Sequence, residues 1–133
     1  MVLTNLQAQD EQTKHFVSEM MWIIVNLSAD DDTQVVQEML VPHHNLLGLV
    51  NQCLLIYGQG DTFDDNIVRN ILWVFGNMIA DTSAQVYETL MNATDLHDFL
   101  VGVVGWPTGM PSSIMMILPW LMNSITQIKP LRD

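Results

Sequence analysis

Two stretches of the chain carry tryptophan, asparagine and aspartate at one common spacing. They are Trp22, Asn26 and Asp30 in the first stretch, and Trp73, Asn77 and Asp81 in the second. Residues four apart lie on one face of an α-helix, so each set predicts a stripe along a helix. An asparagine amide both donates and accepts hydrogen bonds, which suits the backbone of an extended peptide. An indole attracts lysine or arginine by about 0.5–2 kcal/mol, and the aspartate adds a counter-charge.

Two further residues extend these stripes. Asn70 lies three residues before Trp73 and joins its stripe, and Trp120 follows Trp73 by 47 residues. The plainer interpretation is that tryptophans among apolar residues form core, and that asparagine or aspartate near a helix end caps it. Recurrence of the same three residue types at the same spacing favours the interpretation as a binding surface.

The elements that position these stripes are predicted to be helices only. Apolar residues recur three and four apart, whereas clean alternation is hard to find. The pattern predicts helices over about 11–29, 33–41, 43–57, 61–80, 83–92, 95–104 and 112–127. Asp61 or Thr62 is the expected cap of the helix that carries Trp73. The expected fold class is therefore all-α.

The predicted helices follow a long, short, medium order that begins again after each medium helix. Trp73 lies 51 residues after Trp22, which is close to the 47-residue step to Trp120. Helices that recur with a period of forty to fifty residues are typical of a solenoid. We expect one domain over 1–133, with repeated units at about 11–60 and 61–110 and a partial unit at 111–133.

The repeated motif resembles one family in particular. The segment 72–81, LWVFGNMIAD, resembles the WALGNIAGD motif of importin-alpha, an armadillo-repeat adaptor for nuclear localisation signals, and 21–28, MWIIVNLS, resembles its AWALTNIA. The resemblance covers roughly residues 11–130. It implies a right-handed superhelical solenoid of about three armadillo-type repeats. It also implies a peptide-binding groove lined by Trp22, Asn26, Asp30, Asn70, Trp73, Asn77, Asp81 and Trp120.

Composition restricts the kinds of partner. Fifteen acidic residues against four basic ones give a net charge of −11, which should repel nucleic acid and favour a basic peptide or basic protein segment. Keeping an apolar-rich chain soluble is the alternative role of these acids. The single cysteine excludes an internal disulfide and favours a reducing, intracellular compartment, which is the cytoplasm, the nucleus or both. We expect neither a signal peptide nor a membrane span.

The remaining candidate residues do not form a recognisable catalytic or metal-binding pattern. His43 and His44 are adjacent and therefore face different directions on a helix, so no metal site is predicted. The acidic runs at 30–32 and 61–65 lack the alternating acids of a calcium loop. Cys53 has no evident activating base beside it. We expect no catalytic residue, no metal and no cofactor.

Two functional hypotheses follow. The first is a non-catalytic groove for an extended basic peptide of the nuclear-localisation type. The second is a scaffold subunit of a larger assembly that keeps the armadillo fold without transport. Apolar residues at both ends of the chain, from Phe16 to Met21 and from Ile114 to Leu118, predict that further protein chains pack there. The partner's identity, and whether the chain is a fragment or a complete subunit, stay open.

Overall fold

The computed structural model describes residues 9–29, 46–59, 62–80, 84–104 and 111–126. Every regular element in these ranges is a helix, and they contain no strand. The elements are α2 (Glu11–Ser28), α4 (Leu46–Tyr57), α5 (Asp65–Ala80), α6 (Ala84–Ala93), α7 (Leu96–Val104) and α8 (Ser112–Thr126). The all-α prediction is confirmed for these ranges, and the helix expected at 33–41 lies outside them. None of the described helices is both long and apolar enough to cross a membrane.

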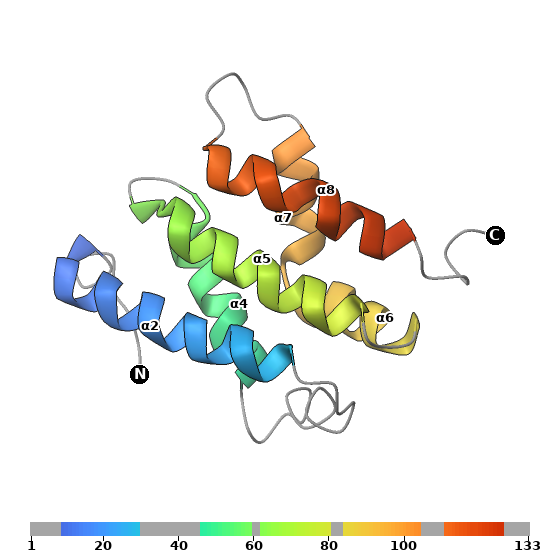
Figure 1. Cartoon of the computed structure of the whole chain (residues 1–133), viewed down its shortest axis with the longest axis horizontal. Helices are drawn as coiled ribbons and strands as arrows, with labels where there is room; N and C mark the ends of the chain where they lie inside the picture. Colours follow the sequence, from blue (N-terminus) through green and yellow to red (C-terminus); the bar gives the residue numbers. More distant parts are fainter. Residues whose placement is uncertain (1–8, 30–45, 60–61, 81–83, 105–110, 127–133) are drawn as a thin grey trace.

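Three long helices lie side by side in one layer. Helix α5 is in the middle, with α2 along one side and α8 along the other (Figure 1). The chain runs in the same direction through all three, so the connections between them return through α4 and through α6 and α7. This parallel arrangement carries equivalent positions of the three helices to the same face of the layer.

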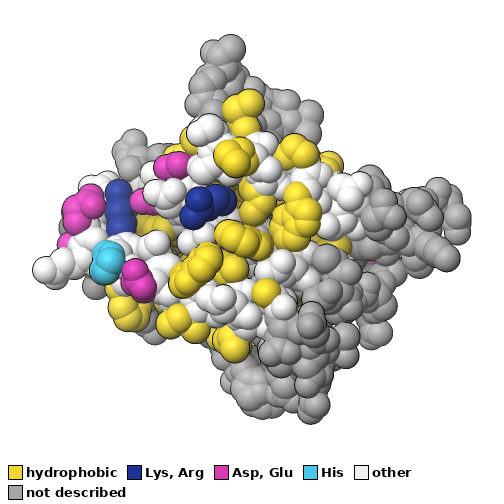
Figure 2. Space-filling model, viewed as in Figure 1, with side chains coloured by type: hydrophobic (Ala, Val, Ile, Leu, Met, Phe, Trp, Pro, Cys, Tyr) yellow, Lys and Arg dark blue, Asp and Glu magenta, His cyan; other side chains and the backbone are white. Residues whose placement is uncertain are grey.

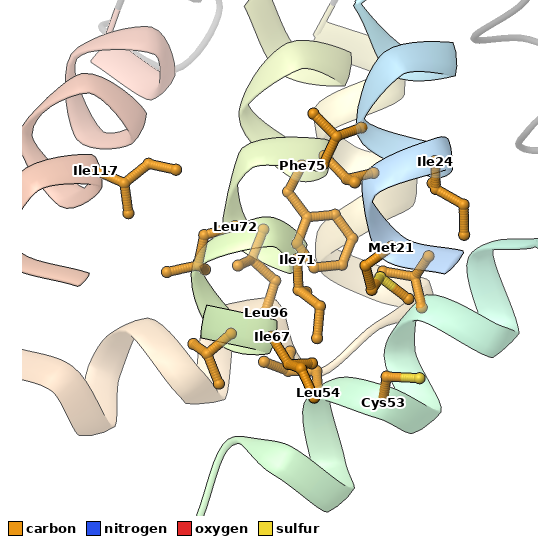
Figure 3. Close-up of a cluster of buried hydrophobic side chains, with 14 of the residues drawn as sticks. Met21, Ile24, Cys53, Leu54, Ile67, Ile71, Leu72, Phe75, Leu96 and Ile117 are labelled. Carbon is orange, nitrogen blue, oxygen red and sulfur yellow. The ribbon is translucent and has the colours of Figure 1, made fainter. Parts of the chain in front are cut away.

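Helix α5 is also the centre of the hydrophobic core. Apolar side chains from it meet others from the helices on either side and from the helices behind it (Figure 3). Almost fully buried members of this cluster include Met21 and Ile24 of α2, Cys53 and Leu54 of α4, Ile67, Ile71, Leu72 and Phe75 of α5, and Leu96 of α7. One continuous core therefore holds the layer together.

Three polar side-chain contacts join elements that are far apart in the sequence. The paired residues are 44, 48 and 49 positions apart. Asn77 Nδ2 donates to Ser28 Oγ at 3.1 Å, Ser113 Oγ donates to Asp65 Oδ2 at 2.7 Å, and the side chain of Asn51 pairs with the Asp95 carboxylate and backbone N–H at 2.9 and 2.8 Å. These pairs hold α2 to α5, the start of α8 to α5, and the residue before α7 to α4.

The start of α5 differs from the prediction. Its cap is Asp64, whose Oδ1 accepts hydrogen bonds from the backbone N–H groups of Asn66 at 3.0 Å and Ile67 at 3.1 Å. Thr62 does not cap the helix, because its hydroxyl donates a hydrogen bond to the backbone carbonyl of Ile56 in α4. Asp61 lies outside the described residues. The helix therefore begins three residues later than Thr62, where a carboxylate can satisfy its first free N–H groups.

The apolar residues expected at the two ends of the chain divide into buried and exposed ones. On α2, Val17 and Met21 are buried, whereas Phe16 is 55% exposed. On α8, Ile114 is buried, whereas Met116 is 80% exposed. The inner side of α2 and of α8 belongs to the core, whereas other apolar residues of the same two helices remain exposed to solvent.

Candidate functional site

Three indoles gather on one face of the helical layer, and we refer to Trp22, Trp73 and Trp120 together as the indole face. The rings of Trp22 and Trp73 meet edge to face, with centroids 5.7 Å apart and an interplanar angle of 72°. Trp22 is 46% and Trp120 38% exposed, and Trp73 is half-buried. Figure 2 shows hydrophobic side chains forming a band across this view of the layer, with Asp and Glu gathered toward the left edge. The parallel helices therefore bring the three predicted tryptophans together.

Trp120 reaches α5 because a glycine leaves room for it. Its six-membered ring lies against Gly76, where an added Cβ would come within 2.5 Å of Cη2 and closer still to Cζ3. Gly76 is three residues after Trp73, on the side of α5 that packs on α8. Close approach of an indole to a helix backbone is possible only without a Cβ at that position. The glycine thus sets where the third indole lies.

Substituting this glycine tests the placement of Trp120. Alanine in a helix interior is about 0.5–1 kcal/mol more favourable than glycine. We expect that gain in Gly102→Ala on α7, where an added Cβ meets nothing within 4 Å. In Gly76→Ala we expect a smaller gain or a loss, because the indole of Trp120 has to move, together with a red shift of tryptophan emission. Equal stabilisation in both variants, measured by thermal unfolding with an unchanged spectrum, would contradict this placement.

A surface groove of about 660 Å³ runs between α5 and α8, and we call it the α5–α8 groove. Its walls combine two indoles with aliphatic side chains, two hydroxyl groups and one guanidinium. The lining residues are Arg69, Trp73, Ser112, Ser113, Met116, Ile117 and Trp120. A volume of this size matches a groove for a small ligand or a short peptide segment.

Sequence reasoning missed Arg69 and Met116 in this groove. Each lies four residues before a tryptophan, Arg69 before Trp73 and Met116 before Trp120, so each shares a helix face with that indole. The spacing rule that grouped the stripes could have found them. Before Trp73 the stripe was extended only to Asn70, three residues earlier, and not to the position four residues earlier.

The predicted asparagines have different environments. Asn26 is exposed, and its Nδ2 donates to the backbone carbonyl of Trp22 on its own helix at 2.9 Å. Asn77 is half-buried and its Nδ2 bonds to Ser28 across α2 and α5. Asn70 is only 3% exposed, so it lies beneath the surface. Of the three amides, Asn26 is the one open to a ligand. Asp30 and Asp81, predicted at the end of each stripe, lie outside the described residues.

The charge within the groove comes from Arg69. Its Nε is buried without a hydrogen-bond partner, and its Nη2 is 3.5 Å from Asn70 Oδ1. No carboxylate of the described residues lies within 4.0 Å of the Arg69 guanidinium. The described residues contain no group of three or more His, Cys, Asp or Glu side chains that could hold a metal ion.

Comparisons with family models, with curated proteins and with solved structures found no match to this chain.

Proposed function

We propose that this chain is a non-catalytic binding module of the importin-alpha-like armadillo type, whose indole face holds an extended, lysine- or arginine-rich peptide. The observation that carries the proposal is the placement of three tryptophans, one on each of three parallel helices, on one face. They recur at steps of 51 and 47 residues. A peptide that crosses the layer would meet one indole at each helix. We further propose that it acts inside the cell, in the cytoplasm or nucleus.

The chemistry of the indole face suits such a peptide. The ring of Trp22 is open to solvent, so the aliphatic stem and charge of a basic side chain can stack on it. Asn26 can exchange the hydrogen bond within its own helix for one to a peptide backbone. A net charge of −11 increases the rate at which a basic segment encounters the protein.

The test uses the most exposed part of the face, so that folding is preserved. We expect Trp22→Ala with Asn26→Ala to weaken binding of a fluorescein-labelled oligolysine peptide by roughly 10- to 100-fold, as for an interface anchor. Fluorescence anisotropy measures the affinity, and circular dichroism checks the helices. Val101→Ala, an exposed apolar truncation on α7, is the matched control and should leave affinity unchanged. Equal affinity in the double variant and the native chain would reject the proposal.

A scaffold subunit is the second candidate, and the free side of α2 favours it. Phe16, Ile23 and Leu27 are 55%, 61% and 44% exposed and share one face of α2. The residues 51 positions further on in α5 are all at most 1% exposed: Ile67, Val74 and Met78. This apolar face is thus buried on the central helix α5 and exposed on the edge helix α2.

Helix α8 also exposes apolar residues whose equivalents on α5 are buried. Met115 and Met122 are 57% and 44% exposed, whereas Val68 and Phe75, which lie 47 positions earlier, are fully buried. Under the scaffold hypothesis a further helical unit of another chain covers these residues. Ile23→Ser with Met115→Ser should then abolish any assembly seen by sedimentation, without changing peptide affinity. A chain that is monomeric at all concentrations and that gains solubility from neither change would count against the scaffold.

A further inference from the structure

Arg69 has an unusual electrostatic environment for a residue of a ligand groove. It lies on α5 one turn before Trp73, and its Nε is buried with no hydrogen-bond partner. The carboxylate one turn before it, on Asp65, accepts a hydrogen bond from Ser113 at 2.7 Å and is not within 4.0 Å of the guanidinium. Within the described residues, the charge of Arg69 therefore has one long contact, to the Asn70 amide at 3.5 Å.

A guanidinium cannot relieve such burial by losing its proton, because arginine stays charged at any pH at which proteins fold. Partial burial of an unpaired charge opposes folding, and a structure retains it where something else pairs with it. The other side chains that line the groove are two indoles, two aliphatic side chains and the hydroxyls of Ser112 and Ser113, none of which carries a negative charge. A ligand bound in the groove can supply the counter-charge that the described residues around Arg69 do not.

We propose that the α5–α8 groove is a carboxylate subsite, which takes an aspartate or glutamate of the bound peptide. The carboxylate pairs with Arg69, and an adjacent apolar side chain packs against Trp120 and Met116. One guanidinium matches one planar carboxylate in a two-pronged hydrogen bond. A dianionic phosphate would need more cations than the groove offers, in a chain of net charge −11. This inference rests on the proposed function and deepens it.

The subsite also fixes the pattern of the peptide. The contact between Trp22 and Trp73 is at the α2–α5 boundary, whereas Arg69 serves the α5–α8 boundary. Neighbouring helices are about 8–10 Å apart, and an extended chain advances about 3.3 Å per residue. The acidic residue is therefore expected about three positions from the basic residue that stacks at the first boundary. The preferred ligand therefore carries an acidic residue in addition to its lysines or arginines.

The experiment compares two labelled peptides in which three lysines are joined through one glycine to Leu-Asp or to Leu-Asn, made in both block orders. In the native chain we expect the aspartate peptide of one order to bind about tenfold more tightly than its asparagine twin, because the asparagine peptide cannot form the charge-assisted hydrogen bond to Arg69. Arg69→Gln should remove this difference. Lys14→Gln, which deletes a positive charge of α2 outside the groove, should keep it.

Each outcome decides a separate point. Equal binding of the twins to the native chain, in both orders, overturns the carboxylate subsite and leaves the proposed function standing. Binding of neither peptide overturns the proposed function, and the subsite falls with it. Tighter binding of a phosphoserine version than of the aspartate peptide overturns the assignment to a carboxylate. Thermal unfolding gives a readout without ligand: Arg69→Gln should melt at the same or a higher temperature than the native chain, because it removes an unpaired, partly buried charge.

Discussion

Phe75→Ala is expected to lower the free energy of unfolding by about 3–5 kcal/mol, the usual cost of truncating a buried aromatic residue. Phe75 is fully buried on α5 and lies in the cluster that joins α2, α4 and α5 (Figure 3). A small domain is stable by about 5–15 kcal/mol, so the variant should be close to the limit of folding. Urea denaturation followed by circular dichroism measures the loss.

Val101→Ala provides the matched comparison, since it also deletes apolar atoms but from a side chain that is 60% exposed on α7. Its effect should stay within about 0.5 kcal/mol. A loss below about 1 kcal/mol for Phe75→Ala would mean that α5 is not the centre of the core.

Cys53 is expected to resist thiol reagents until the chain opens. It is fully buried, and burial raises the pKa of its thiol from 9.0 to about 11. At pH 8 the reactive thiolate is then roughly 100-fold scarcer than in an unfolded chain, before any steric protection is counted. It is the only cysteine of the chain, so a chromogenic disulfide reagent reports on it alone. Labelling at the same rate in buffer and in denaturant would contradict its burial.

The raised pKa of the Cys53 thiol predicts how the free energy of unfolding depends on pH. A thiol whose pKa is higher in the folded state keeps its proton there after the unfolded chain has lost it. Its contribution is complete below pH 9 and is lost as the pH rises toward 11, at about 1.4 kcal/mol per pH unit. Burial, followed by the charges of Cys53 and Asp64, also raises the pKa of Tyr57, which acts in the same direction. Cys53→Ala should therefore show a shallower alkaline loss of stability than the native chain.

The helices and their order could be predicted from the sequence because they depend on local pattern. Spacings of three and four, the proline and glycine breaks, and acidic caps gave helices that agree with the described ones to within about three residues at most ends. The cap of α5 was misplaced because several acids and a threonine precede that helix. Only the fold shows that Thr62 is bonded to α4 and that Asp64 is free to cap.

The candidate site was predictable in part. The position of each tryptophan on its helix follows from spacing, and parallel packing then brings the three together. The burial of Asn70 was not predictable, since its place on α5 differs little in angle from that of Asn77 and depends on how closely the neighbouring helices approach. The isolation of Arg69 was not predictable either. It depends on Ser113, 48 residues from Asp65, taking the carboxylate that would otherwise be the nearest on its own helix.

The most direct test of the indole face as a peptide-binding surface is a ¹⁵N–¹H NMR titration of the indole N–H groups. A Trp106→Phe variant leaves three of the four tryptophans, Trp22, Trp73 and Trp120, as the only indole signals. On addition of the lysine-rich peptide, all three signals should shift together along a single binding curve. A peptide with glutamates in place of the lysines should leave them in place. Three unmoved indole signals while backbone signals elsewhere follow the binding curve would contradict the account.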